Sequence, residues 1–452
     1  MTFNSPRLLL GLSVCLWISI PAAARAADIA DIGHIVLEIN SANIERTVRK
    51  LVSFGTRNTL STQTDPNRGI GAARDWLYAE FQAVSKESGG RLKVEMQTFE
   101  QPAGARIPKP TKLTNVIAML PGDKYTPEQR VYVVSGHYDS MPSSPTDGVS
   151  DAPGANDDAS GTAAVLEMAR VMSKYHFDAP IVFMAVAGEE QGLLGAAYAA
   201  EQAKAKGWHV QAMFTNDIIG NTHGGNGIFD DKRVRVFSEG VPTDETPAQA
   251  TARKSVGGEN DGPSRQLARF IKESADRFVK GIKVQLIYRR DRYSRGGDHI
   301  PFLERGFPAV RFTEPNEDYR HQHQNVRMED TVQYGDLPDF VDFPYIAQVA
   351  RVNASALAML ASAPDSPHGV TLSSRLSYDT SLTWTADTEP NLYGYEIVWR
   401  PTDEPLWKQS RFVGNVTTFT VNGLSKDNYL FGVRAIDKQG RKSPVSYPKA
   451  GR

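Results

Sequence analysis

Histidine and acidic residues follow the apolar segments of this chain at several places. The apolar runs 131–134, 180–187 and 212–215 are each followed within a few residues by side chains that can bind a metal ion or transfer a proton. An acidic pair also precedes the helix predicted over 160–175, and two histidines lie in a late loop. These residues are His137, Asp139, Asp157, Asp158, Glu189, Glu190, Asp217, His321 and His323. Imidazole and carboxylate groups are suitable zinc ligands, and one carboxylate can bridge two zinc ions.

Taken singly, members of this set have ordinary explanations. Asp158 is well placed to cap the helix that follows it, and a pair of glutamates usually lies on a solvated surface. Glu189 and Glu190, however, follow the buried run 181–187, where adjacent carboxylates repel each other unless cations compensate their charge. Because the chain has a single cysteine, a zinc site must use histidine and acidic ligands.

Alternating helices and strands between about residues 35 and 360 would position these side chains. The predicted helices cover 70–88, 160–175, 193–206, 264–279 and 343–360, and the predicted strands cover 92–99, 113–120, 131–134, 180–187, 212–215, 284–288 and 309–312. The polar stretch 240–263 has no usable period and is expected to be a surface loop. This alternation predicts an α/β fold with a mixed, mostly parallel sheet and helices on both faces. Ligands in such folds bind beyond the carboxyl ends of the strands.

From about residue 366 onward the pattern changes to short alternating runs separated by turn residues. Such a pattern is typical of an all-β sandwich, here of about 85 residues. The runs include 381–384, 393–399, 417–421 and 429–435. The segment resembles a fibronectin type III module in the residues Trp384, Tyr429, Phe431, Val433 and Ala435. Modules of this kind usually act as spacers or bind a polymer or surface, so no catalytic role is expected here.

Residues 1–26 have the pattern of a secretory signal peptide. Arg7 precedes the apolar run 8–20, and Ala24-Arg25-Ala26 forms a cleavage site. The apolar run is too short to span a bilayer, so no membrane span is expected. Cleavage would remove the only cysteine and leave a thiol-free protein, which suits the periplasm or the external medium. The formal net charge of −1 gives no reason to expect nucleic acid as a partner.

Six short blocks occur in a fixed order along the middle of the chain. They are His137-Tyr-Asp139, the stretch Pro153–Gly161, Glu189-Glu190, Asn216-Asp217, Gly297-Asp298-His299 and the late histidine. In this order they resemble the co-catalytic di-zinc exopeptidases, metallopeptidase family twenty-eight, typified by secreted bacterial leucyl aminopeptidases. The resemblance covers about residues 40–360 and implies the zinc exopeptidase fold. The expected segments are a signal peptide (1–26), an exopeptidase domain (27–361), a linker (362–367) and a fibronectin type III domain (368–452).

The resemblance implies two zinc ions held by His137, Asp157, Glu190, Asp217 and His323. Asp157 would bridge the two ions. His137 and Asp217 would complete one site, and Glu190 and the late histidine would complete the other. Of the two histidines in the late loop, His323 is favoured over His321.

The same resemblance implies roles for two further acidic residues. Glu189 would be the general base, and Asp139 would hydrogen-bond to His137 and fix its tautomer. The peptide bond between Asp157 and Asp158 is cis in such proteins.

Together these assignments predict a secreted aminopeptidase that hydrolyses the N-terminal peptide bond of peptides with a free N-terminus. Proteins of similar pattern also include carboxypeptidases acting on acidic C-termini and single-zinc glutaminyl cyclases, which stay open as alternatives. The loop arginines Arg289, Arg290, Arg292 and Arg295 either bind a substrate carboxylate or form a solvated surface. A catalytically inactive binding protein is a further alternative, although every ligand position and the base position hold competent residue types.

Overall fold

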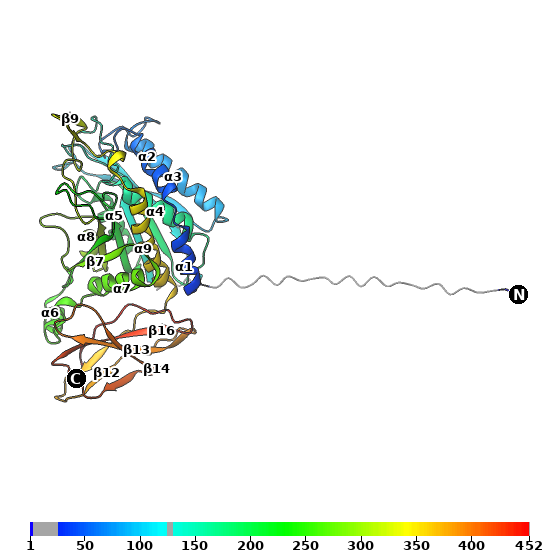
Figure 1. Cartoon of the computed structure of the whole chain (residues 1–452), viewed down its shortest axis with the longest axis vertical. Helices are drawn as coiled ribbons and strands as arrows, with labels where there is room; N and C mark the ends of the chain where they lie inside the picture. The colour runs from blue at the N-terminus through cyan, green and yellow to red at the C-terminus, as the bar shows by residue number, and fades with distance from the viewer. Residues whose placement is uncertain (3–25, 124–129, 452) are drawn as a thin grey trace.

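The computed structural model of the chain describes residues 1–2, 26–123 and 130–451 (Figure 1). The signal peptide expected over 1–26 lies almost entirely outside the described residues. Within those residues, no helix is long and apolar enough to cross a bilayer. The chain forms a large α/β part followed by an all-β part (Figure 1).

The α/β part is built around an eight-stranded sheet with the order β1-β2-β4-β3-β5-β8-β6-β7. These strands are β1 (Lys93–Gln101), β2 (Thr111–Leu120), β3 (Arg130–His137), β4 (Ile181–Val186), β5 (His209–Asn216), β6 (Arg233–Ser238), β7 (Lys283–Ile287) and β8 (Ala309–Thr313). β3 pairs parallel with β4 and β5, and β5 pairs parallel with β8, whereas β1–β2, β2–β4 and β6–β8 are antiparallel. The predicted mixed sheet is confirmed, with parallel strands at its centre.

Helices cover both faces of this sheet (Figure 1). They are α1 (Ile29–Glu38), α2 (Ser41–Val52), α3 (Gly69–Glu87), α4 (Ala159–Met172), α5 (Leu194–Ala205), α6 (Pro247–Lys254), α7 (Pro263–Phe278), α8 (His299–Leu303) and α9 (Phe343–Ser362). The short elements are the 3-10 turns Gly258–Asn260 and Pro338–Phe340 and the hairpin β9 (Arg327–Glu329) and β10 (Val332–Tyr334). Val134 of β3 belongs to the core cluster shared with α4 and α9, and its neighbour Val133 belongs to the cluster shared with α5. Successive strand residues therefore serve opposite faces, as strand geometry requires.

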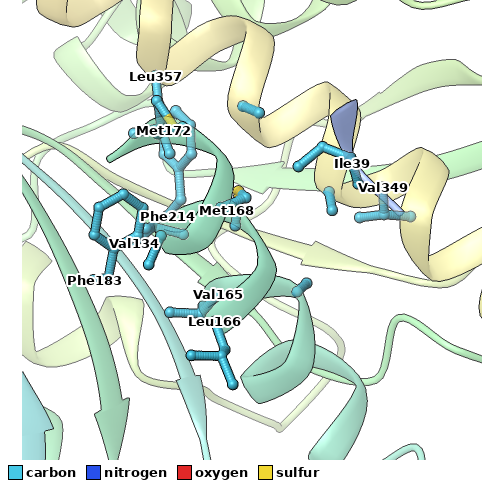
Figure 2. Packing of buried hydrophobic residues seen from close by; sticks show 14 of the residues in the cluster. Ile39, Val134, Val165, Leu166, Met168, Met172, Phe183, Phe214, Val349 and Leu357 are labelled. Carbon is cyan, nitrogen blue, oxygen red and sulfur yellow. The ribbon is translucent and has the colours of Figure 1, made fainter. Parts of the chain in front are cut away.

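Helix α4 lies at the centre of the larger core. Val165, Met168 and Met172 of α4 lie beside Phe214 of β5 and Leu357 of α9 (Figure 2). All five side chains are fully buried, and truncating one such side chain to alanine typically costs about 2–5 kcal/mol. This packing fixes the position of the loop that enters α4, which is important for the site described below.

The stretch 240–263 differs from the loop expected there, because it contains helix α6. Thr246 and Gln249 form a capping box at its start, and Pro247 occupies the first turn. None of its eight residues is buried, so the helix has no apolar stripe from which its period could be recognised.

The C-terminal part is a sandwich of two sheets with the orders β15-β12-β11-β17 and β14-β13-β16. Its strands are β11 (Thr371–Ser373), β12 (Thr380–Thr383), β13 (Leu392–Pro401), β14 (Gln409–Gly414), β15 (Thr418–Val421), β16 (Tyr429–Asp437) and β17 (Lys449–Gly451). Trp384, Phe431 and Val433 lie in its core, where Trp384 meets Tyr395 with 5.3 Å between ring centroids. The predicted all-β module is confirmed.

The sandwich lies next to α7 and neighbouring loops of the α/β part (Figure 1). A buried ionic contact joins the two parts. The carboxylate of Asp261 accepts hydrogen bonds from Arg400 of β13 at 2.7 and 2.8 Å and from Arg269 of α7 at 2.9 Å. The backbone oxygen of Pro405 accepts hydrogen bonds from Arg269 Nε at 2.7 Å and from the Tyr288 hydroxyl at 3.2 Å. These contacts, of which the ionic one is buried, join the module to the α/β part.

Candidate metal centre

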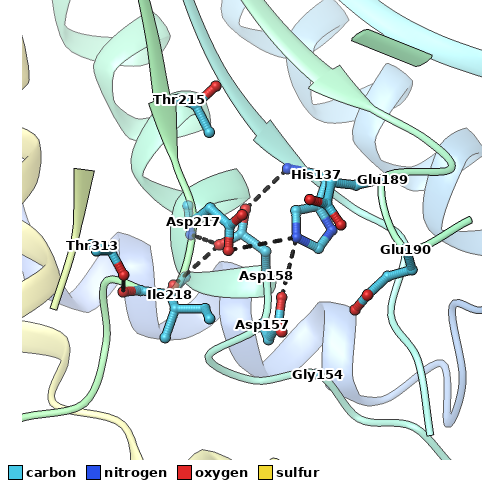
Figure 3. Close-up of polar contacts among 12 residues, drawn as sticks. His137, Gly154, Asp157, Asp158, Glu189, Glu190, Thr215, Asp217, Ile218 and Thr313 are labelled. Atoms are coloured by element: carbon cyan, nitrogen blue, oxygen red, sulfur yellow. Dashed lines mark hydrogen bonds and ion pairs between the residues drawn. The ribbon is translucent and has the colours of Figure 1, made fainter. Parts of the chain in front are cut away.

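The expected site residues lie at the carboxyl ends of the central parallel strands (Figure 3). β3 ends at His137, β4 is followed by the turn that holds Glu189 and Glu190, and Asp217 directly follows β5. Asp157 lies in the loop that enters α4. Because neighbouring parallel strands end at the same edge of a sheet, the fold brings together residues that are far apart in sequence.

His137, Asp157 and Asp217 form the first group of possible metal ligands. The Nε2 atom of His137 lies 3.1 Å from Asp157 Oδ1 and 3.9 Å from Asp217 Oδ1. One ligand atom from each residue lies within 4.8 Å of the other two, and all three residues are buried.

Asp157, Glu190 and His323 form the second group. The Nε2 atom of His323 lies 3.0 Å from Asp157 Oδ2 and 3.0 Å from Glu190 Oε2. The two carboxylate oxygens of Asp157 therefore face different groups, which is the geometry required of a carboxylate that contacts two metal ions.

The two histidines of the late loop have different surroundings. His323 belongs to the second ligand group and adopts a left-handed backbone conformation with φ of 53°. The ring of His321 instead stacks on Phe340, with 3.7 Å between centroids, and its Nδ1 lies 3.9 Å from Asp318. The structure thus brings His323, and not His321, to the other expected ligands.

The site concentrates acidic groups in a buried place. Burial raises the pKa of Glu189 well above its usual value, and the nearby Asp217 and Glu190 raise it further, although His137 opposes them. Burial also raises the pKa of Glu190, whose Oε1 atom accepts no hydrogen bond from any described residue. Mutually repelling carboxylates, two imidazoles and an unpartnered buried oxygen together fit the donor set of a divalent cation.

Asp139 supports the turn that carries the two glutamates. Its two carboxylate oxygens accept hydrogen bonds from the backbone amides of Glu189 and Glu190, each at 3.2 Å. The Nδ1 atom of His137 lies 3.2 Å from the backbone oxygen of Asp139 and 3.5 Å from its Oδ1 atom. Asp139 therefore lies beside His137, where its backbone oxygen is at hydrogen-bond distance from Nδ1, and its carboxylate holds the backbone of the turn.

Asp158 has two structural roles. Its Oδ1 atom caps α4 by accepting a hydrogen bond from Gly161 N at 2.9 Å, and its Oδ2 atom accepts one from His137 N at 2.9 Å. The peptide bond between Asp157 and Asp158 is cis. The cap thus also ties the end of β3 to the start of α4.

Arg57 joins two loops of the site, although no sequence motif marks it. Its Nε donates to the backbone oxygen of Tyr138 at 2.7 Å, and its Nη2 donates to that of Gly154 at 2.9 Å. The side chain is fully buried, and burial lowers the pKa of its guanidinium to about 10, while Asp336 and other nearby acids oppose that shift.

Asp336 is a second support without a sequence signal, because it lies 179 residues from its partner Asp157. Its carboxylate accepts hydrogen bonds from the backbone amides of Asn156 at 2.9 Å and of Asp157 at 2.7 Å. Burial raises the pKa of Asp336 to about 7, although these two hydrogen bonds oppose the shift. Asp336 therefore fixes the backbone from which Asp157 projects.

Arg311 and Asp298 are further charged residues of the site. Burial disfavours the ionised form of Asp217. The positive charge of Arg311, 2.9 Å away, and the contact with His137 outweigh burial and hold the pKa of Asp217 at about 2. Asp298 is buried, and neither of its carboxylate oxygens accepts a hydrogen bond within the described part of the chain. Burial, Asp139 and Asp217 raise the pKa of Asp298 to about 7. Asp298 lies in the sequence block Gly297-Asp298-His299, which marks its position but not its role.

A cavity of about 670 Å³ gives access to the site. Its acidic and histidine lining consists of Asp157, Glu189, Glu190, Asp217 and His323, and its basic lining consists of Arg106, Arg292 and Arg295. Its volume is in the range of small-ligand pockets.

Proteins of similar sequence align with nearly the whole of this chain. A probable zinc metalloprotease of Leptosphaeria maculans is 47% identical over 428 residues, which cover 94% of this chain and 99% of that protein. A probable zinc metalloprotease of Pyricularia oryzae is 48% identical over 429 residues, covering 93% of this chain and 85% of that protein.

Solved structures of similar fold include LapB from Legionella pneumophila, with 21% identity and a TM-score of 0.53 over 74% of this chain and 75% of that one. They also include an aminopeptidase from Aneurinibacillus sp. strain AM-1, with 15% identity and a TM-score of 0.52 over 73% of this chain and 96% of that one. The model of peptidase family M28 matches residues 115–339, and that of the fibronectin type III domain matches residues 365–450. The chain therefore belongs to peptidase family M28 and carries a fibronectin type III domain at its C-terminal end.

Proposed function

We propose that this chain is a zinc-dependent aminopeptidase that hydrolyses the N-terminal peptide bond of peptides. The observation that carries this proposal is the position of Asp157, whose two oxygens face two ligand groups, with Glu189 lining the same cavity. Similarity over nearly the whole chain to proteins named as probable zinc metalloproteases supports zinc as the metal.

Two zinc ions would occupy the two ligand groups. His137 and Asp217 would hold one ion, Glu190 and His323 would hold the other, and Asp157 would contact both. Bound zinc supplies Lewis-acid chemistry, since it lowers the pKa of water and polarises a scissile carbonyl group.

Glu189 would move the protons of the reaction. It belongs to neither ligand group and lines the cavity, so its carboxylate is free to accept the proton of the attacking water and to pass it to the leaving amine. Asp139 would hold Glu189 in place through the hydrogen bond that it accepts from Glu189 N at 3.2 Å.

Capture of the free α-amine would make the enzyme an exopeptidase. The free α-amine would bind beside the ion held by Glu190 and His323, at the part of the cavity that these two residues line. With the amine held there, only the first peptide bond lies at the reacting groups.

We further propose that residues 1–26 are removed on export, so that the protein works in the periplasm or the medium. The peptidase would then occupy 27–361, with the linker at 362–367 and the module at 368–452. The module would supply any contact with a polymer or surface.

Substitution of Glu189 tests the proposed base. Glu189→Gln should lower kcat on an aminoacyl nitroanilide by about 10²–10⁴-fold, while metal analysis still finds two zinc ions per chain. Near-normal turnover of the zinc-loaded variant would refute the assignment. A chelator should abolish wild-type activity, and added zinc should restore it.

The two loop histidines provide a matched pair for the metal assignment. His323→Ala should lose zinc and activity, whereas His321→Ala should keep both, because His321 stacks on Phe340 outside the ligand groups.

A substrate panel separates the alternatives: hydrolysis of free-amine peptides indicates an aminopeptidase, and hydrolysis of N-acylated peptides with acidic C-termini indicates a carboxypeptidase. One zinc per chain together with cyclisation of glutaminyl peptides indicates a cyclase.

A further inference from the structure

The cavity over the site has an acidic part and a basic part. The acidic part contains the expected metal ligands and Glu189, as described above. The basic part is formed by Arg292 and Arg295 from the loop 289–297 and by Arg106 from the segment between β1 and β2. Nothing in the proposed chemistry at the metals uses these arginines.

Arg292 and Arg295 of the loop and Arg235 of β6 have fewer acidic partners than positive charges. Glu317 is the shared partner of Arg235 at 3.0 Å, Arg292 at 3.1 Å and Arg295 at 2.9 Å. Arg292 also pairs with Asp291 at 3.2 Å, so two carboxylates face these three guanidinium groups. Arg295 Nη1 also donates to the neutral Gln322 at 3.2 Å, and its side chain keeps 30% of its surface exposed. Arg295 is therefore accessible from the cavity and incompletely neutralised.

Arg106 lies on a different element and forms no ion pair with any described carboxylate. It is held at the tip of a tight turn, in which Gly104 and Ile107 exchange backbone hydrogen bonds at 2.6 and 3.2 Å. Its Nη1 atom donates to the backbone oxygen of Glu190 at 2.6 Å, which places the guanidinium beside the catalytic cavity. The remaining donors of this exposed side chain are available to a ligand.

We propose that Arg106 and Arg295 bind a carboxylate of the substrate on the far side of the scissile bond from the α-amine. This inference rests on the proposed aminopeptidase function and adds a substrate class, namely peptides that carry a carboxylate close behind their first residue. Guanidinium groups bind carboxylates with fixed geometry and often through two hydrogen bonds, which gives selectivity as well as affinity. Either the C-terminus of a dipeptide or tripeptide or an acidic second side chain supplies this carboxylate.

Kinetics on matched substrates test the proposal and separate the two sources. With the zinc-loaded full chain, leucyl-glycine should have a KM about tenfold lower than leucyl-glycinamide, with similar kcat, because only the first carries a carboxylate. If leucyl-glutamyl-amide shares the low KM, an acidic side chain is a second source. Equal KM values for all three substrates overturn the proposal.

Variants assign the preference to the two arginines. Arg106→Ala and Arg295→Ala should each reduce the KM ratio between amide and free-carboxylate substrates severalfold. Arg289→Ala is the matched control, because Arg289 belongs to the same loop but contacts Tyr293 and does not line the cavity. A preference that survives both cavity substitutions, or is lost equally in the control, overturns the assignment.

A binding measurement makes the test independent of turnover. Calorimetric titration of zinc-loaded Glu189→Gln with leucyl-glycine and with leucyl-glycinamide should show tighter binding of the former, and Arg295→Ala in that background should abolish the difference. If none of the leucyl substrates is hydrolysed by the wild-type chain, the proposed aminopeptidase function fails, and the calorimetric ratio still decides the carboxylate site. Equal Kd values for the two ligands overturn the site whatever the activity.

Discussion

Asp261 is the residue through which the attachment of the fibronectin type III domain can be tested most directly. Its side chain is fully buried, and the side chains of Arg400 and Arg269 are 1% and 4% exposed. Asp261→Asn keeps the shape of the side chain but removes its charge. The substitution therefore leaves two buried guanidinium groups opposite a neutral amide.

The expected cost follows from the asymmetry of buried ion pairs. Removing one partner of a buried pair typically costs about 3–5 kcal/mol, because the remaining charge stays desolvated without compensation. The amide oxygen of asparagine still accepts one hydrogen bond, so the lower end, about 3 kcal/mol, is expected for Asp261→Asn. In a domain the size of the sandwich, about 3 kcal/mol corresponds to a fall in Tm of more than about 10 °C.

Differential scanning calorimetry of the full chain measures this effect. We expect one main transition in the wild type, and in Asp261→Asn an additional earlier transition from the loosened sandwich. The control is Glu404→Gln, which removes the exposed pair with Lys408 and should cost less than about 1 kcal/mol. If Asp261→Asn melts within about 2 °C of the wild type, the ionic contact does not hold the two parts together.

Two other supports give sharp predictions. Asp336→Asn should weaken zinc affinity by about 10–100-fold, because it removes the carboxylate that accepts hydrogen bonds from the backbone amides of Asn156 and Asp157. Competition with a chromogenic chelator measures the zinc affinity. An unchanged affinity would contradict this role of Asp336. Asp365 lies in the proposed linker before the module. Burial raises the pKa of its carboxyl group, but His368 and Arg130 outweigh burial and lower that pKa to about 2, and Asp365 in turn raises the pKa of His368. The stability that Asp365 contributes is therefore fully present above its unfolded pKa near 3.8 and is lost as the pH falls through 2. The stability that His368 contributes is fully present below its unfolded pKa of 6.5 and is lost as the pH rises through its folded pKa. The Tm difference between wild type and Asp365→Asn should therefore be largest between about pH 4 and 6.5, and a difference that does not vary with pH would contradict this account.

The elements that carry the site were predictable because their sequence signals are local. The apolar run 131–134 ends close to His137, and the strand found there, β3, ends at that residue. The same holds for the run before Glu189 and Glu190, since a fully buried strand needs no alternation to be recognised. Strand β6, in which arginines alternate with apolar residues, was not among the predicted strands.

The supports of the site were not predictable, because they depend on contacts between distant segments. Arg57 meets the loop around Gly154 across 97 residues, and no local pattern announces such a contact. The choice between His321 and His323 was also not predictable, because the sequence of a loop does not determine in which direction each side chain points. The left-handed backbone of His323 and the stacking of His321 on Phe340 decide it.

The oxygen of Pro405 has a consequence for how the two parts of this chain evolve. It accepts a hydrogen bond from Tyr288, the residue directly before the loop that carries the cavity arginines, so the start of this loop contacts the C-terminal module. A module joined in this way cannot be exchanged for another module without affecting the α/β part. A change at Arg400 on one side must be matched at Asp261 on the other. Selection on the cavity loop therefore extends to a domain that contributes no described residue to the cavity.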